Sequence, residues 1–277
     1  MATPPPPPPP AGGGVTPGAG AIPARSFGDI FSTAFELYKT HFVKLVGIVA
    51  IVVVPLTLIQ YLLTDQVFVR EVTVDPDTFE VNTTGIGAWW AIWLVTIFIG
   101  VIVQAILSGA IARAAAGAAI GEPITAEGVY KFGLSRLGAI IWVSILVGLA
   151  TIGGFILLII PGIIVMVKLS VSVQSLVVEN KRGTEALSRS WNLTKGYFWH
   201  VLGVVIVTAI LVGIVQGIIA APFGSNWFLA GIGASIGAII VLPFSALVYV
   251  IMYLNLRVKK EQLNVATLQS DMQRSAA

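Results

Sequence analysis

The sequence predicts an all-α integral membrane protein with six transmembrane helices, arranged as three repeats of an interfacial amphipathic helix followed by a helical hairpin. Three observations lead to this fold class. The chain of 277 residues is 56% hydrophobic and 10% charged, with a mean hydropathy of +0.92, whereas soluble domains carry about 25% charged residues. Apolar runs of roughly 20 residues, enough to cross a bilayer, follow one another along most of the chain. A basic, aromatic helix start precedes such a run three times.

This repeated motif defines the three repeats. Residues 34–51 (AFELYKTHFVKLVGIVAI) align without gaps on residues 190–207 (SWNLTKGYFWHVLGVVIV), and a fainter copy at residues 132–136 (FGLSR) precedes another apolar run. Aromatic and basic residues just before a span are typical of helices at the membrane surface. We assign an interfacial or structural role to the following residues of the motif and its surroundings: Phe35, Lys39, Glu179, Arg189, Trp191, Lys195 and Trp199.

Both ends of the chain differ in composition from the membrane domain, which we place at residues 26–257. Residues 1–25 contain seven consecutive prolines and a Gly/Pro/Ala-rich stretch, without the basic and apolar regions of a signal peptide. We predict a disordered cytoplasmic tail with its prolines in polyproline II, either without a partner or bound by a proline-recognising protein. Residues 258–277 are predicted to be a polar, helical cytoplasmic tail. The repeats lie at about 26–121, 122–180 and 181–257.

The first repeat opens with a helix-start signature. Ser26 and Asp29 have the spacing of a capping box, and aromatic residues then recur at helical spacing. We expect this amphipathic helix to lie in the headgroup layer, to pack on protein, or both. Span one is predicted at about 43–63 with a kink at Pro55. A polar, acidic segment with a short strand or hairpin separates it from span two, at about 88–111.

The second and third repeats start with interfacial helices at residues 125–137 and 183–197. The apolar run over residues 139–167 is too long for one span of about 20 residues. We expect it to break at Pro161–Gly162, where proline ends one helix and glycine permits a tight turn. The remaining spans follow from these limits: 139–160, 162–178, 199–220 and 229–256.

Lysine and arginine set the orientation. In the six-span arrangement they fall on one side of the membrane, apart from Lys168 within span four and Arg70 in an opposite loop, which is acidic. The positive-inside rule therefore places both termini and the three interfacial helices in the cytoplasm.

Composition excludes several classes of site. The chain has no cysteine, so it has no disulfide, thiolate metal site or cysteine nucleophile. Its histidines, His41 and His200, lie on separate segments, and we predict no metal, no cofactor and no enzymatic activity. The net charge of +3 and the pI near 9.2 do not indicate nucleic-acid binding, because the charges lie at span ends. The oligomeric state stays open.

A series of short motifs resembles a known membrane family. The motifs follow one another at 161–164 (PGII), 167–170 (VKLS), 177–179 (VVE), 185–191 (EALSRSW) and 193–199 (LTKGYFW). The series is similar to the glycerophosphoryl diester phosphodiesterase membrane-domain family and the related YciC-like bacterial inner-membrane proteins. The resemblance implies a multi-pass protein of the bacterial cytoplasmic membrane. In active family members a separate soluble domain performs the hydrolysis, and the resemblance extends here to the membrane unit only.

Lys168 is the residue that most invites a functional hypothesis, because a basic residue within a span costs about 2.5–3.5 kcal/mol to insert. Ser172 and Ser175 follow on its helical face, and Gln104 and Gln216 of other spans are expected to face the same interior. These side chains would bind an anionic headgroup or line a polar path. Alternatively, Lys168 reaches the outer interface by snorkelling, or closes a structural hydrogen-bond network.

Other charged residues of this region are expected to form ion pairs. Glu179 ends span four close to the third interfacial helix and is predicted to form a salt bridge to the repeat helices; coupling to a substrate or proton is the alternative. Glu185 and Arg189 have the i,i+4 spacing of a helical ion pair.

Together these features predict a non-enzymatic membrane protein that organises or assists envelope or lipid processes. Its basic aromatic helices would bind anionic lipid, each exposed basic residue contributing roughly 1 kcal/mol. The alternative is a transporter or lipid-translocating protein with an intramembrane polar path around Lys168.

Overall fold

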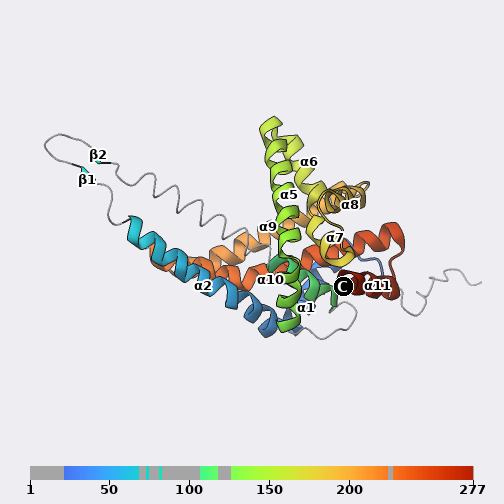
Figure 1. Ribbon diagram of the computed structural model, residues 1–277, viewed down its shortest axis with the longest axis horizontal. Coiled ribbons are helices and arrows are strands. Elements are labelled where there is room, and N and C mark those ends of the chain that lie inside the picture. The colour runs from blue at the N-terminus through green and yellow to red at the C-terminus, as the bar shows by residue number, and fades with distance from the viewer. Residues whose placement is uncertain are drawn as a thin grey trace, which may run out of the picture.

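The computed structural model describes residues 22–68, 73–74, 81–82, 107–117, 126–223 and 227–276 (Figure 1). Within these ranges the elements are helical, apart from a short antiparallel pairing of β1 (Thr73–Val74) with β2 (Val81–Asn82). Four helical segments there are long and apolar enough to cross a membrane, or five if two helices joined by a sharp bend count as one. The helical, multi-pass class is therefore confirmed. Most of predicted span two and the proline-rich stretch lie outside the described residues, so the six-span count stays a prediction.

Helix α1 (Phe27–Thr40) begins at the predicted capping box. The Ser26 hydroxyl accepts a hydrogen bond from the Asp29 amide (3.3 Å), and the Asp29 carboxylate accepts one from the Ser26 amide (3.0 Å). The face of α1 that carries Tyr38 is buried in the protein, whereas Phe35 is exposed. The helix therefore packs on protein with one face and presents aromatic surface with another.

Three long helices form an elongated bundle: α2 (Phe42–Phe68), α9 (Phe198–Ala220) and α10 (Trp227–Glu261). At His41 the chain bends by 81° between α1 and the first part of α2, so α1 crosses the end of the bundle. Pro55 and Pro243 lie inside α2 and α10. The Tyr38 hydroxyl donates a hydrogen bond to the Ile240 carbonyl (2.7 Å), one turn before Pro243, and this contact fixes α1 to α10.

Helices α5 (Leu137–Leu157) and α6 (Ile159–Leu169) form a hairpin that stands across the bundle instead of lying along it (Figure 1). The chain turns at Leu158, whose backbone is extended (φ −170°, ψ 160°). The predicted break at Pro161–Gly162 is therefore wrong.

Local packing explains why the turn comes earlier. Pro161 lies in the first turn of α6, where an amide hydrogen would have no partner within the helix. The two glycines serve close packing of the arms: a side chain at Gly154 would come within 3.0 Å of the Gly162 backbone, and one at Gly162 would collide with the Phe155 ring.

Shorter helices gather at one end of the bundle: α4 (Ala126–Ser135), α7 (Ser172–Glu179), α8 (Thr184–Thr194) and α11 (Val265–Ala276). Predicted span four is thus interrupted between α6 and α7. The C-terminal segment is helical, as predicted, and it is also packed: α11 lies against α7 and buries Leu268 and Met272.

Candidate functional site: a lysine–aromatic cluster beside an ion-pair network

The break between α6 and α7 is bridged by a side chain of α8. Ser190 Oγ donates a hydrogen bond to the Lys168 carbonyl (2.7 Å) and accepts one from the Val171 amide (3.3 Å). These are two of the backbone groups that an interrupted helix leaves without their helical partners. One step further along, Ser175 Oγ donates to the Ala186 carbonyl (3.2 Å). Helix α8 is therefore fixed alongside α7, with its C-terminal end next to Lys168.

The Lys168 side chain lies over aromatic rings. Its Nζ atom is 5.8 Å from the centre of the Trp191 ring and 6.0 Å from that of the Phe198 ring. A cation in this position is stabilised by about 0.5–1 kcal/mol at an exposed site and by more where water is excluded. Lys168 also lies in the last turn of α6, where the partial negative charge of the helix end favours a cation.

Two further lysines carry charges near that of Lys168. The charges of Lys195 and Lys260 are close enough to repel that of Lys168. The ammonium group of Lys260 also donates a hydrogen bond to the Asn192 carbonyl at the end of α8. We call Lys168, Lys195, Lys260, Trp191 and Phe198 the lysine–aromatic cluster.

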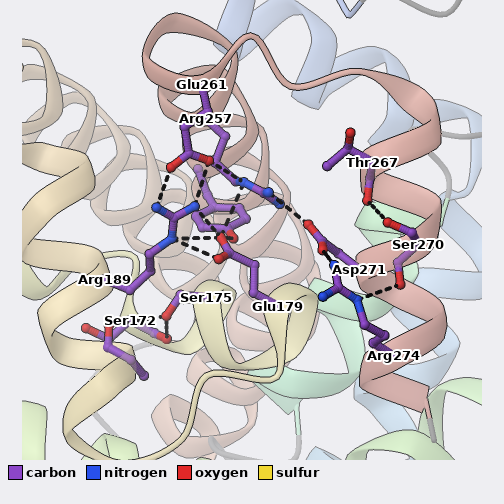
Figure 2. Close-up of polar contacts among 12 residues, drawn as sticks. Ser172, Ser175, Glu179, Arg189, Arg257, Glu261, Thr267, Ser270, Asp271 and Arg274 are labelled. Atoms are coloured by element: carbon purple, nitrogen blue, oxygen red, sulfur yellow. Dashed lines mark hydrogen bonds and ion pairs between the residues drawn. The ribbon is translucent and has the colours of Figure 1, made fainter.

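Beside this cluster, arginines and carboxylates form a network that joins α7, α8, α10 and α11 (Figure 2). Arg189 binds Glu179 (Nε–Oε2 2.8 Å) and also Glu261. Arg257 contacts Glu179 (3.3 Å). The ion pair predicted for Glu179 is therefore present, whereas the Arg189 partners are not the Glu185 that helical spacing suggested.

The network continues into α11. Arg257 Nη2 lies 2.8 Å from Asp271 Oδ2, and Asp271 also binds Arg274. Burial lowers the pKa of Arg189, but its hydrogen bonds with Glu261 and Glu179 and their charges outweigh burial, so the pKa lies above its ordinary value. The Tyr253 hydroxyl donates a further hydrogen bond to Glu179.

The ion-pair network and the lysine–aromatic cluster differ in net charge. The network contains three arginines and three carboxylates, which neutralise one another. In the part of the chain that the structure describes, no carboxylate lies within ion-pair distance of Lys168, Lys195 or Lys260. The lysine–aromatic cluster therefore carries uncompensated positive charge. Trp199, next to the cluster in sequence, is 78% exposed, as is usual for tryptophan at a membrane interface.

The structure does not gather the predicted ligand-binding residues into one path. Ser172 and Ser175 are buried, and their hydroxyls donate to backbone carbonyls. Gln216 lies near the far end of α9, where its amide donates to the Ala234 carbonyl (3.4 Å). Gln104 lies outside the described residues. Lys168 lies beside α8 and not at the tip of the hairpin.

The first repeat also contains a lysine placed over an aromatic ring. Lys39 Nζ lies 5.6 Å from the centre of the Phe35 ring. These residues align with Lys195 and Trp191 of the third repeat, but there the ring is approached by Lys168 of α6 instead. The third copy therefore concentrates more positive charge than the first.

Several residues that build this region were not predicted from the sequence. Arg257 and Glu261 have the i,i+4 spacing that indicates a helical ion pair, and this signal was present in the sequence. For Asn255, by contrast, the sequence contains no such signal. Its side chain accepts a hydrogen bond from the Arg25 amide (2.8 Å) and donates one to the Arg25 carbonyl (3.1 Å). That pairing joins residues 230 positions apart.

Within the described ranges, no group of three or more His, Cys, Asp or Glu side chains is placed to hold a metal ion. The ammonium groups, the aromatic rings and the exposed tryptophan of this region are suited to binding an anion at a membrane surface. Comparison with protein-family models, with curated proteins and with solved structures found no match for this chain. The family resemblance therefore rests on the sequence motifs alone.

Proposed function

We propose that this chain is a non-enzymatic, multi-pass membrane protein that binds anionic lipid headgroups through the lysine–aromatic cluster, and so organises or assists lipid processes in a bacterial envelope. The single observation that carries the proposal is the charge imbalance. Lys168 lies over Trp191 and Phe198 within reach of the charges of Lys195 and Lys260, while the neighbouring carboxylates are already engaged with arginines. An anionic phosphate group would supply the missing negative charge.

The surroundings of the cluster suit a lipid better than a soluble anion. Apolar side chains are exposed along α9, which starts at Phe198, and Trp199 is exposed beside it. A headgroup at the lysines would place its acyl chains against this apolar surface. Each basic residue near a membrane surface contributes roughly 1 kcal/mol to the attraction of anionic lipid.

The distribution of basic residues indicates on which side of the membrane the proposed site lies. The cluster lies on the side that the positive-inside rule assigns to the cytoplasm. The middle hairpin returns to the side on which it began whether or not it crosses the membrane, so this assignment does not depend on it. We therefore place the site at the cytoplasmic face of the bacterial inner membrane, with the three interfacial helices of the repeats.

Lipid analysis of the protein purified in mild detergent tests the proposal. Wild type is expected to carry more anionic lipid than the bulk membrane contains, and Lys168→Leu to carry less than wild type. Lys168→Arg keeps a cation above the rings and serves as the conservative variant. Arg274→Met removes an exposed basic residue of α11, outside the interfacial helices, and serves as the matched control. Equal lipid content in wild type and Lys168→Leu would refute the proposed site.

A further inference from the structure

The α5–α6 hairpin ends in an entirely apolar tip. The six residues Phe155–Ile160 are each between 43% and 79% exposed, and none of them is polar. The other turn between long helices, after α9, reads APFGSNW over residues 221–227. It contains the polar and aromatic residues expected where a chain emerges at an interface. The hairpin tip lacks them, so it is unsuited to emerging into water.

The turn also satisfies its own backbone. The Leu158 amide donates to the Gly154 carbonyl (3.1 Å), and the Gly162 amide donates to the Leu158 carbonyl (3.1 Å). A single extended residue thus reverses the chain while its amide and carbonyl stay bonded. Backbone groups in the hydrocarbon core must form hydrogen bonds within the protein, because no water is present there to donate or accept them.

The α6 arm sets how far the tip lies beyond Lys168, which with its aromatic neighbours we take as the level of the interface. Lys168 is ten residues from Leu158 along the chain, so at 1.5 Å per residue the tip lies at most about 15 Å beyond this level, half of a bilayer core of about 30 Å. The α5 arm has 21 residues and is itself long enough to cross, so only the part of it that pairs with α6 lies beyond that level. Helix α9, which starts at the same level, has 23 residues and reaches about 34 Å by the same arithmetic.

The direction of the hairpin shortens its reach further. In Figure 1 the hairpin stands across α2, α9 and α10 rather than alongside them. If the bundle crosses the membrane, a hairpin set across it penetrates less deeply than its own length. Its contacts are mainly between its two arms, and it also packs on α7, α8 and α9.

We propose that the α5–α6 hairpin is a re-entrant element that lies in the acyl chains of one leaflet, the leaflet whose headgroups face Lys168, and does not cross the membrane. Its partner is the lipid of that leaflet. The inference rests on the proposed headgroup site for the level of the interface at Lys168, and it does not depend on which lipid Lys168 binds. It replaces the predicted third and fourth spans by a single half-inserted hairpin.

Single spin labels in vesicles of phosphatidylethanolamine and phosphatidylglycerol test this directly, because the full chain has no cysteine of its own. Leu149→Cys and Leu158→Cys both replace exposed leucines of the hairpin, in the middle of the α5 arm and at the tip. Depth is measured from the relative access of oxygen, which concentrates at the bilayer centre, and of a water-soluble nickel complex. Ala221→Cys, at the end of α9, is the matched control for a turn that follows a complete crossing.

We expect the label at Leu158 to be at least as deep as that at Leu149, and the label at Ala221 to be accessible to the nickel complex. A hairpin that crosses the membrane gives the opposite order, with Leu149 near the centre and Leu158 shallow, and this order would overturn the proposal. Shielding of Leu158 from both oxygen and nickel would also overturn it, because protein and not lipid would then cover the tip.

Discussion

Individual residues of the site draw their roles from partners that are distant in sequence. Lys168 stood out in the sequence as a basic residue in an apolar run. Its ring partners, Trp191 and Phe198, follow 23 and 30 residues later, and Lys260 comes from the end of α10. The sequence therefore identified the residue that needs a partner, but not the partners, because they meet only after α6, α8 and α10 are packed.

Arg257 is the residue on which the ion-pair network depends most. It is buried and contacts carboxylates of three helices: Glu179, Glu261 and Asp271. We predict that Arg257→Met lowers the free energy of unfolding by about 3–5 kcal/mol, because three carboxylates then share two arginines and one negative charge of the network is left uncompensated. Thermal unfolding in detergent measures the effect.

Arg274 provides the comparison for this prediction. It binds the same Asp271, but its side chain is 73% exposed, and exposed ion pairs contribute about 0–1 kcal/mol. Arg274→Met should therefore change stability by no more than this amount. Equal losses in the two variants would show that burial does not determine the strength of the network.

Among the elements, the hairpin shows how far sequence patterns reach. The apolar run over residues 139–167 correctly predicted two helices, and its excess length correctly predicted a break. The position of the break was wrong, because proline is equally suited to the first turn of a helix. What sets the turn is the approach of Gly154 to Gly162, a contact between two helices that no local pattern reveals.

The adjacent glycines of α5 give a matched test of this packing. A side chain at Gly154 would approach the Gly162 backbone to 3.0 Å, whereas one at Gly153 would meet nothing within 4 Å. Gly154→Ala is expected to destabilise the protein by about 1–3 kcal/mol through overpacking. Gly153→Ala should be neutral or stabilising by up to about 1 kcal/mol, since alanine favours the helix. The reverse order in thermal unfolding would contradict the packing of the hairpin.

Helix α11 was predicted as a helix, but its packing against the rest of the protein was not. Its polar composition predicted a helical tail, but its few apolar residues are buried against α7, and Leu268 is fully buried. Leu268→Ala should cost about 2–5 kcal/mol, seen as faster protease cleavage of the C-terminal segment. Gln269→Ala, on the exposed face, should leave the cleavage rate unchanged. If both variants were cleaved like wild type, α11 would not be docked in solution.

At the scale of the whole molecule, composition was sufficient to predict the helical membrane class. The distribution of lysine and arginine was sufficient to predict which side of the membrane faces the cytoplasm. The chain is helical with several membrane-length apolar segments, as its hydropathy required. The three-repeat arrangement could be proposed from internal alignment, but the way in which α5 and α6 stand across the bundle could not. Periodicity describes which face of a helix is apolar and not which neighbour or lipid covers it.

Sidedness is tested with the positions that the structure exposes. Ser270→Cys lies on α11 and Ala221→Cys at the end of α9. A membrane-impermeant maleimide should label Ala221→Cys in intact cells and Ser270→Cys only in inverted vesicles, because the basic side is retained in the cytoplasm. Labelling of Ser270→Cys in intact cells would invert the orientation.

The central claim is that the lysine–aromatic cluster binds anionic headgroups, and lipid titration tests it most directly. The delipidated protein is titrated with phosphatidylglycerol or phosphatidylcholine, and lipid-bound species are counted by native mass spectrometry. We expect preference for phosphatidylglycerol in wild type, and a roughly fivefold weaker affinity in Lys168→Leu, equivalent to the loss of about 1 kcal/mol. Arg274→Met, which removes an exposed basic residue of α11 outside the interfacial helices, should bind like wild type. Equal affinity for the two lipids in wild type, or unchanged affinity in Lys168→Leu, would contradict this account.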